Sequence, residues 1–371
     1  MKKVFSSLLA LSLVLGVLFA GGCAGADDGA IGLDTSKLVG TYTKELEGTK
    51  LNVFNWGEYI SDGFEGSLDV NKAFEKLTGI TVNYSNYFTN EALYTKLIGG
   101  GASYDVIIPS DYMIERLISE DMVQKINFDN IPNYKYIPDD FKNFYFDQNN
   151  EYSIPYTNGY VGLIYNKTLV DEVPTSWNVL WDEKYSGQIL MFDNSRDAFG
   201  ITQFLLDIDL NTTNEADWVK CADKLKELKP LAQFVMDKIF DIMDRGEAAV
   251  APYYAGDFVS MSENNLDLEL VYPKEGTNAF VDSFCIPKSA QNVAAAEMYI
   301  NFLLEPEVAL ENAEYICYSC PHTAVLQDER YSLKDSEVLY PKQKIESDYF
   351  HNLDQSTLDL ISGLWEEVKL S

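Results

Sequence analysis

The feature that most constrains this chain is an alternation of short apolar strands with amphipathic helices, which begins at Leu51. β-Branched and aromatic runs favour strands, whereas apolar residues three and four apart favour helices. This pattern predicts strands at 51–56, 80–84 and 104–108, and helices at 68–77, 90–98 and 111–117, with Ser110 or Asp111 capping the last. A β-α-β-α order of this kind predicts a parallel sheet covered by helices.

The alternation starts again in the second half of the chain. Strands are expected at 161–165, 188–192, 248–252 and 268–272, and helices at 197–206, 216–228 and 292–304. The chain has 371 residues, which is too long for one average hydrophobic core. We therefore expect an α/β protein with two lobes of similar size.

The first 22 residues have the pattern of a lipoprotein signal peptide. Lys2 and Lys3 precede an uncharged apolar run from Val4 to Ala20, and small residues lead to Cys23. This resembles the lipobox of bacterial lipoproteins, in which the cysteine is lipidated and becomes the new N-terminus, although Ala20 stands where Leu is usual. The alternative is an uncleaved membrane anchor, for which the run is short. We expect a signal peptide over 1–22, lipidation of Cys23 and a flexible tether over 23–49.

Charge and composition narrow the class of ligand. The formal net charge is −30, which disfavours nucleic acid and anionic lipid and attracts cations, although it can equally serve solubility. There are 24 Tyr and 20 Phe residues, so aromatic side chains are available to line a pocket as well as to fill a core.

The sequence offers little for catalysis or metal binding. It contains two His residues and no Gly-x-Ser-x-Gly, phosphate-loop or His-Glu-x-x-His motif. A two-carboxylate hydrolase stays open, because acidic residues are abundant. Cys317 and Cys320 form a lone CxxC, which we interpret as a local disulfide or two buried thiols. We expect a binding protein without cofactor or metal, not an enzyme.

Two predicted loops follow strands at the edge of a parallel sheet where ligands bind. The first carries Trp56, Glu58 and Tyr59, and the second carries Ser110 and Tyr112. Both place aromatic groups beside polar or acidic groups, which suits a cationic organic ligand. Core packing and helix capping are the alternative roles for these residues.

At this point the residues resemble a known family. The stretches LNVFNWGEYI (51–60), YDVIIPSDYMIERL (104–117) and YYAGD (253–257), with KAFEKLTGITVNYSNYFTNEALYTKL between the first two, are similar to the bacterial spermidine/putrescine-binding proteins of polyamine ABC transporters. Further similar stretches follow in the family's order from Leu51 to the C-terminus.

The resemblance implies a type II periplasmic-binding-protein fold. Each of two lobes would be a mostly parallel sheet flanked by helices, with a cleft between them. The chain would cross between lobes near 156–159, near 279–281 and after Ala324. We expect lobe 1 to comprise 50–157 plus 281–326, and lobe 2 to comprise 158–280 plus 327–371.

The resemblance also implies which residues bind the ligand. Aromatic rings would sandwich a methylene chain and carboxylates would hold its ammonium ends. The matching positions are Trp56, Glu58, Tyr59, Ser110, Tyr112, Asn194, Asp197, Tyr254, Asp257, Phe280, Asp282 and Tyr318.

Several positions depart from the family pattern. Gly57 replaces a hydroxyl residue, Asn194 an acidic residue and Tyr254 a Trp, while Asp257 and Phe280 match putrescine binders. The family's late Gln falls near position 350 or 351.

The implied function is capture of putrescine or spermidine outside the cytoplasm and delivery to a membrane ABC permease. We expect a monomer that is lipid-anchored through Cys23 and does not bind nucleic acid. The alternatives are the same fold binding another small organic cation or amine, and a cleft enzyme acting on an amine-like substrate through Cys285 or Cys317.

Overall fold

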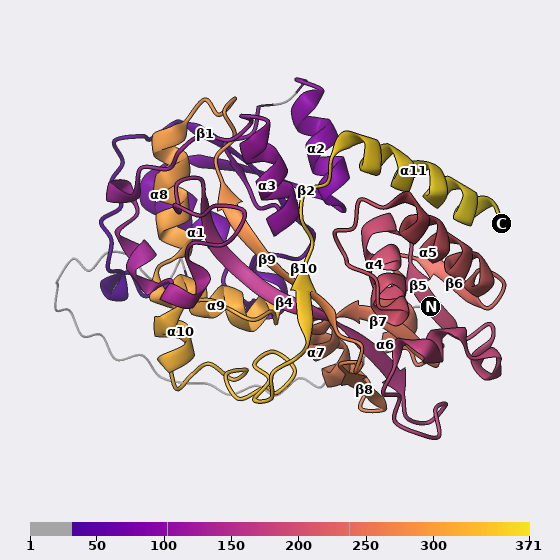
Figure 1. The fold of residues 1–371 in the computed structure, drawn as a ribbon. Helices are drawn as coiled ribbons and strands as arrows, with labels where there is room; N and C mark the ends of the chain where they lie inside the picture. Colours follow the sequence, from indigo (N-terminus) through magenta and orange to yellow (C-terminus); the bar gives the residue numbers. More distant parts are fainter. Residues whose placement is uncertain (1–31, 102, 237) are drawn as a thin grey trace, which may run out of the picture.

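The computed structural model describes residues 32–101, 103–236 and 238–371. Two α/β lobes stand side by side, and the long strands β4 and β9 run from one to the other (Figure 1). The predicted signal peptide and Cys23 lie outside the described residues. Among the helices that are described, none has the length and apolar character that a bilayer crossing requires.

Lobe 1 contains the first predicted alternation. Strand order β2-β1-β3-β9 places the first strand in the centre, and β1 pairs in parallel with both β2 and β3. Its elements are β1 (Lys50–Trp56), α1 (Val70–Thr78), β2 (Thr81–Tyr87), α2 (Asn90–Ile98), β3 (Val106–Ile107), α3 (Asp111–Ser119), α8 (Val293–Leu303), α9 (Pro306–Ile316) and α10 (Thr323–Gln327).

Lobe 2 contains the second alternation. Strands β6, β5 and β7 pair in parallel, and β4 lies antiparallel to β7 and β8. Its elements are β5 (Ile189–Phe192), α4 (Ser195–Leu206), α5 (Glu215–Leu228), β6 (Ala232–Val235), α6 (Lys238–Asp244), β7 (Val250–Tyr254), α7 (Ala255–Asn264), β8 (Leu268–Val271) and α11 (Gln355–Leu370).

Three strands join the lobes. β4 (Ser153–Asn166) and β9 (Thr277–Cys285) pair antiparallel, with an irregularity between Pro155 and Thr157, and β10 (Ser347–Tyr349) adds to β9. The result is a mixed ten-stranded sheet in which β1, β2 and β3 of lobe 1, and β5, β6 and β7 of lobe 2, pair in parallel as expected. The sheet is mixed because β9 runs antiparallel to β3 of lobe 1 and β4 runs antiparallel to β7 and β8 of lobe 2.

Local sequence signals fix the helix ends that matter for the site. The Asn194 side chain caps α4 by accepting from the Arg196 backbone N–H at 3.0 Å, and the Asp354 side chain caps α11. Ser110 occupies the cap position of α3 as predicted, but its side chain makes no capping hydrogen bond. The Ser110 hydroxyl is therefore available to contact groups other than the helix backbone.

Separate hydrophobic clusters support the two lobes. Leu51, Phe74 and Phe302 lie in one, and Trp177, Phe199 and Trp218 in another. β4 contributes Tyr156 to the first and Val161 to the second. The exact lobe boundaries stay a prediction, although Tyr331 of the segment assigned to lobe 2 packs with Ala309 and Leu310 of α9.

The segment before β1 differs from the expected tether. Over residues 32–49, Leu33 is buried and joins the lobe 1 core. Val39 and Gly40 donate their backbone N–H groups to Glu305 at 2.7 Å, and the Tyr42 hydroxyl donates to the same carboxylate at 2.7 Å. The prediction of a flexible tether was therefore wrong for this part, because a fully buried carboxylate of lobe 1 holds it.

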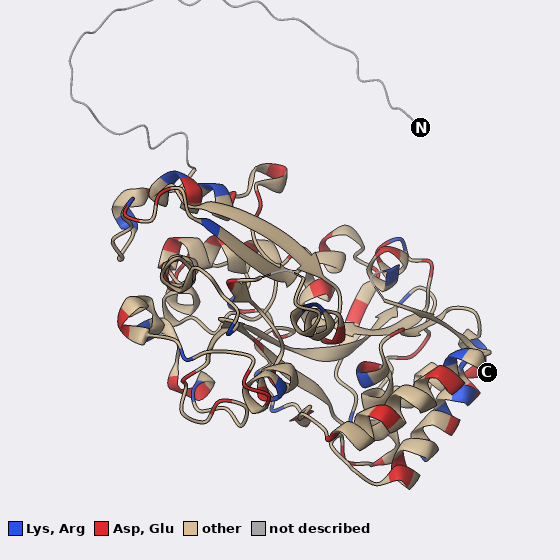
Figure 2. Cartoon of the chain, turned by 90° about the horizontal axis from the view of Figure 1, so that it is seen from above, with Lys and Arg blue, Asp and Glu red and all other residues tan. Residues whose placement is uncertain are grey.

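Charged residues lie over the whole body. Figure 2 shows Asp and Glu on helices and loops of both lobes rather than gathered on one of them. The strongly negative net charge is thus a property of the entire surface. A specific cation site has to be argued from individual carboxylates.

Candidate functional site

The predicted binding residues come from six segments that meet where the lobes join. Loops after β1 and β3 carry the early residues, and the N-termini of α4 and α7 carry Asp197 and Asp257. β9 supplies Phe280 and Asp282, and the turn after α9 supplies Tyr318. Side-chain contacts link nine of the twelve predicted binding residues, all except Trp56, Glu58 and Tyr112.

Asp282 is the carboxylate at the lobe 1 end. Its side chain is 4% exposed, and Oδ2 accepts from the Tyr59 hydroxyl at 2.6 Å and from Thr157 Oγ1 at 3.4 Å. A backbone bridge brings Ser110 beside it. Burial raises the pKa of Asp282 to about 6, and the neighbouring hydroxyl groups only partly offset this. Oδ1 has no hydrogen-bond partner within the described part of the chain, so one acceptor remains for a donor from outside.

Asp197 is the carboxylate at the lobe 2 end. It lies 8% exposed in the first turn of α4, and its Oδ2 accepts from the Tyr254 hydroxyl at 2.9 Å and from the Asn194 amide at 2.7 Å. Burial raises the pKa of Asp197 to about 6, against the effect of the Tyr254 hydrogen bond. An amide at position 194 can donate to Asp197, which an ionised acid cannot do.

Aromatic rings connect these two carboxylates. The ring of Tyr59 lies 5.2 Å from that of Tyr318, which lies 6.1 Å from Phe280, which in turn lies 5.8 Å from Tyr254. The interplanar angles of 76°, 60° and 83° are edge-to-face or tilted arrangements that aromatic pairs prefer. We call these four rings the aromatic row. The Tyr318 hydroxyl also donates to Asp257 at 3.1 Å, which adds a third carboxylate beside the row.

Two glycines leave room for the aromatic row. A Cβ atom on Gly256 would lie 2.1 Å from Cδ2 of Tyr318, and one on Gly159 would lie 2.7 Å from Cζ of Phe280. Both distances are far below van der Waals contact. Neither glycine was recognised from the sequence, because its partner ring comes from a distant segment.

Three predicted residues lie outside this set of contacts. Trp56 donates its indole N–H to the Ile108 carbonyl at 2.8 Å and packs on Tyr87, with ring centroids 4.5 Å apart. Glu58 is exposed, with a positive φ of 52°. Tyr112 donates its hydroxyl to Glu91 at 2.9 Å. Their roles as ligand contacts stay predictions.

Sequence reasoning also missed residues that the structure brings to the site. Thr157 lies directly opposite Asp282 in the β4–β9 register, so predicting that strand pair would have found it. Arg196 is 5% exposed and its guanidinium stacks on Phe350 at 4.4 Å, near the position expected for the late Gln. Its Nη2 donates to the carbonyl of His351 at 3.1 Å.

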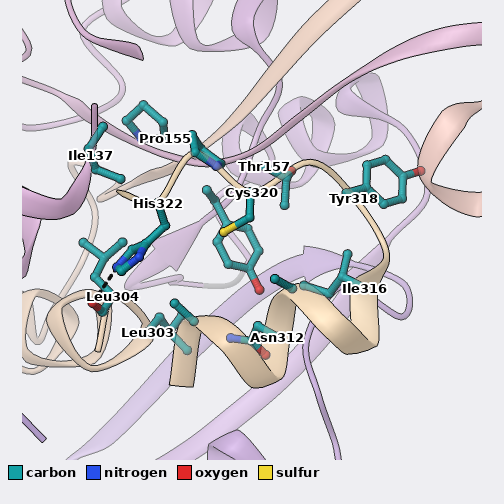
Figure 3. Close-up of a pocket in the computed structure, with 14 residues that line it drawn as sticks. Ile137, Pro155, Thr157, Leu303, Leu304, Asn312, Ile316, Tyr318, Cys320 and His322 are labelled. Atoms are coloured by element: carbon teal, nitrogen blue, oxygen red, sulfur yellow. Dashed lines mark hydrogen bonds between the residues drawn. The ribbon is translucent and has the colours of Figure 1, made fainter. Parts of the chain in front are cut away.

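A small cavity of about 20 Å³ lies behind the Asp282 end of the site. Figure 3 shows mostly apolar lining residues, with the Tyr318 hydroxyl directed away from the others. His322 approaches the Leu304 carbonyl at 3.1 Å, and burial lowers the pKa of this imidazole to about 4. The cavity has room for about one water molecule and belongs to the core rather than to a ligand site.

The cysteines are not placed for nucleophilic chemistry. Cys221, Cys285, Cys317 and Cys320 are all free and buried, so the CxxC pair is present as two thiols. Burial raises the pKa of Cys285 and of Cys317, which disfavours the reactive thiolate. No cluster of His, Cys, Asp and Glu suited to a metal ion occurs in the residues of known placement.

The fold and the site define a two-lobed α/β binding protein whose polar and aromatic groups meet between the lobes. The profile of the bacterial extracellular solute-binding protein family matches residues 102–339. The chain belongs to this family.

Individual proteins that are similar to this chain agree with the family assignment. The spermidine/putrescine-binding periplasmic protein of Escherichia coli is 34% identical over 294 residues, which is 78% of this chain and 83% of the relative. A putrescine-binding periplasmic protein of Pseudomonas aeruginosa is 26% identical over 86% of this chain and 91% of its own length. A solved structure titled as a putative spermidine/putrescine ABC transporter from Listeria monocytogenes has a TM-score of 0.81 and 35% identity, covering 87% of this chain and 99% of that chain.

Proposed function

We propose that this protein is an extracytoplasmic receptor that captures a small polyamine, putrescine or spermidine, and delivers it to an ABC importer. One observation carries the proposal. The aromatic row runs between two buried carboxylates, Asp282 and Asp197, with Asp257 at its side.

This arrangement matches the chemistry of a polyamine. Such a ligand is an apolar rod with a positive charge at each end. Aromatic faces bury the methylene groups and attract the ammonium groups by cation–π contact, worth up to about 2 kcal/mol when desolvated. A buried ammonium also needs a carboxylate partner, because an unpaired charge away from water is very costly.

The printed names of the relatives support the same ligand class. The Escherichia coli relative is named for spermidine and putrescine and the Pseudomonas aeruginosa relative for putrescine. Asn194 in place of an acid and Asp257 beside Tyr318 favour the shorter ligand in this chain.

Calorimetric titration of the purified protein with putrescine and spermidine tests the proposal. n-Butylamine, which has the same carbon chain as putrescine and one ammonium group, is the matched control ligand. We expect putrescine to bind more tightly by about 2–5 kcal/mol, the usual loss when one buried charge pair is broken. No heat and no thermal shift with any polyamine at micromolar concentration would exclude this function.

A second candidate is another small organic cation. This candidate is considered because the residues at Gly57, Asn194 and Tyr254 differ from the pattern of the polyamine-binding family. Mass spectrometry of ligand retained through gentle purification separates the two, because a mass other than that of a polyamine favours the second candidate.

We further propose that the chain is held at the membrane by lipidation of Cys23 and acts as a monomer. The basic, apolar and small-residue order before Cys23 supports the anchor. Labelled fatty acid should enter the wild-type protein and not Cys23→Ser, which should leave the membrane fraction. Equal labelling of both proteins would rule out this anchor.

A further inference from the structure

A larger cavity, of about 300 Å³, lies where residues of the two lobes face each other, next to the N-terminus of α4. Lobe 1 lines it from α2 and α3 with Glu91, Tyr112 and Arg116. Lobe 2 lines it from α4 and α11 with residues that include Ser195, Arg196 and Asp359. In Figure 1, α2 and α11 approach each other across the gap between the lobes.

Glu91 faces the Asp197 end of the site from the opposite lobe. Its Oε1 accepts the Tyr112 hydroxyl at 2.9 Å, and the Tyr112 ring lies 5.4 Å from the Arg196 guanidinium. Arg196 immediately precedes Asp197 in the first turn of α4. The cavity thus brings Glu91 opposite Arg196, the neighbour of Asp197, and the negative charge of Glu91 adds to burial in raising the pKa of Asp197.

The balance of charge at this end requires a further carboxylate. Arg196 is 5% exposed, and its Nε and Nη1 have no hydrogen-bond partner among the residues described. Its positive charge opposes that of Asp197, and position 194 is a neutral Asn. Arg196 can offset only one of the two carboxylates that face it here, Asp197 and Glu91, so Glu91 leaves a net negative charge at this end of the site.

We propose that Glu91 is a specificity-determining residue which, with Asp197, holds one ammonium end of the bound polyamine between the two lobes. This rests on the proposed function. Without ligand the two carboxylates repel each other across the gap, and a cation between them turns repulsion into attraction. The ligand itself thus joins the lobes, and Glu91 replaces the acid that is missing at position 194.

The test compares Glu91→Gln with Asp121→Asn by calorimetric titration with putrescine and spermidine. Asp121 is an exposed carboxylate just after the end of α3, with a φ of 57° that Asn accepts readily, so the control removes the same charge from lobe 1. We expect Glu91→Gln to raise the Kd at least tenfold and Asp121→Asn to change it less than twofold.

A rescue variant separates a direct role from damage to the fold. Glu91→Gln combined with Asn194→Asp returns a carboxylate to the same ammonium from the other lobe and should recover at least half of the loss in log Kd. Small-angle scattering should show less compaction on ligand addition for Glu91→Gln than for the wild type.

The outcomes distinguish the two proposals. If the wild type binds no polyamine, the proposed function fails. If the wild type binds and Glu91→Gln binds equally well, or if the double variant is no better than Glu91→Gln, the role of Glu91 is overturned alone.

Discussion

The hydroxyl of Tyr59 donates a 2.6 Å hydrogen bond to Oδ2 of Asp282, across 223 positions of sequence. This is the length of a charge-assisted O–H···O⁻ bond. It ties the loop after β1 to the centre of β9 and leaves Oδ1 of the same carboxylate without a partner in the described residues. Asp282 is thus positioned by one oxygen and available through the other.

Replacing Asp282 by Asn should weaken polyamine binding by about 2–5 kcal/mol, because a buried ammonium loses its charged partner. Isothermal titration of wild type and variant measures the change. Asp140→Asn, at an exposed position, is the control for loss of one charge and should bind normally. A Kd for Asp282→Asn equal to that of the control would remove Asp282 from the site.

Stability of the ligand-free protein should fall as pH rises from about 4 to about 6. The pKa values of Asp197 and Asp282 are about 6 in the folded protein, above the ordinary 3.8, so the folded state holds protons that the unfolded state has released. Each group costs at most about 3 kcal/mol once ionised.

Urea unfolding at several pH values checks this sign. The stability of Asp282→Asn relative to wild type should increase between pH 4.5 and pH 7.5, since the variant has no proton to lose there. A constant difference would contradict the raised pKa of Asp282.

Polyamine affinity should have the opposite dependence on pH. An ammonium group pairs with ionised carboxylates, so the affinity is nearly complete about one pH unit above 6 and falls as Asp197 and Asp282 take up protons around and below pH 6. Titrations at pH 5, 6 and 7.5 measure the trend. Equal affinity at pH 5 and pH 7.5 would show that neither carboxylate titrates in this range.

Tyr254→Phe should keep the ring of the aromatic row and lose only the hydrogen bond to Asp197. That bond lowers the pKa of Asp197, so its loss should shift the acid limb of binding to higher pH and weaken affinity by about 1 kcal/mol at neutral pH. Titrations at pH 6 and pH 8 measure this, and the ratio of the Kd of the variant to that of wild type should be larger at pH 6. Parallel curves would assign the residue a packing role only.

Gly256→Ala should displace Tyr318, because the added Cβ would overlap Cδ2 of that ring. We expect a loss of about 1–3 kcal/mol in stability, with weaker polyamine binding. Gly363→Ala is the matched control, since a Cβ there meets nothing within 4 Å in an exposed turn of α11, and it should stabilise by up to about 1 kcal/mol. Chemical denaturation measures the change in the free energy of unfolding, which should fall for Gly256→Ala and rise for Gly363→Ala.

The sequence predicted the first six elements of lobe 1, from β1 to α3, well because each rests on a local signal. The helix expected at Asn90–Ile98 has those bounds, and the strand expected at Leu51–Trp56 begins one residue earlier. β9 was missed because all nine of its residues are buried, so it shows no alternation of apolar and polar residues. The first half of β4 was missed because Pro155 and Gly159 interrupt its pattern.

The sequence supplied candidate residues for the site but not their arrangement in space. Family resemblance supplied Asp282 and Asp197, yet their partners Thr157 and Tyr254 depend on strand register and lobe contact. The position of Glu91 could not be predicted from the sequence for the same reason. It reads as an ordinary first-turn acid of a helix, and only the fold brings it opposite α4.

The segment before β1 is attached to Glu305 of lobe 1, and this attachment bears on how a membrane-anchored receptor is held. If Cys23 carries the anchor proposed above, about ten residues separate it from Gly32, and a fully extended chain of that length spans at most about 35 Å. Because Val39, Gly40 and Tyr42 are hydrogen-bonded to Glu305 of lobe 1, the proposed anchor attaches the receptor to the membrane through lobe 1, so lobe 2 is connected to the bilayer only through lobe 1.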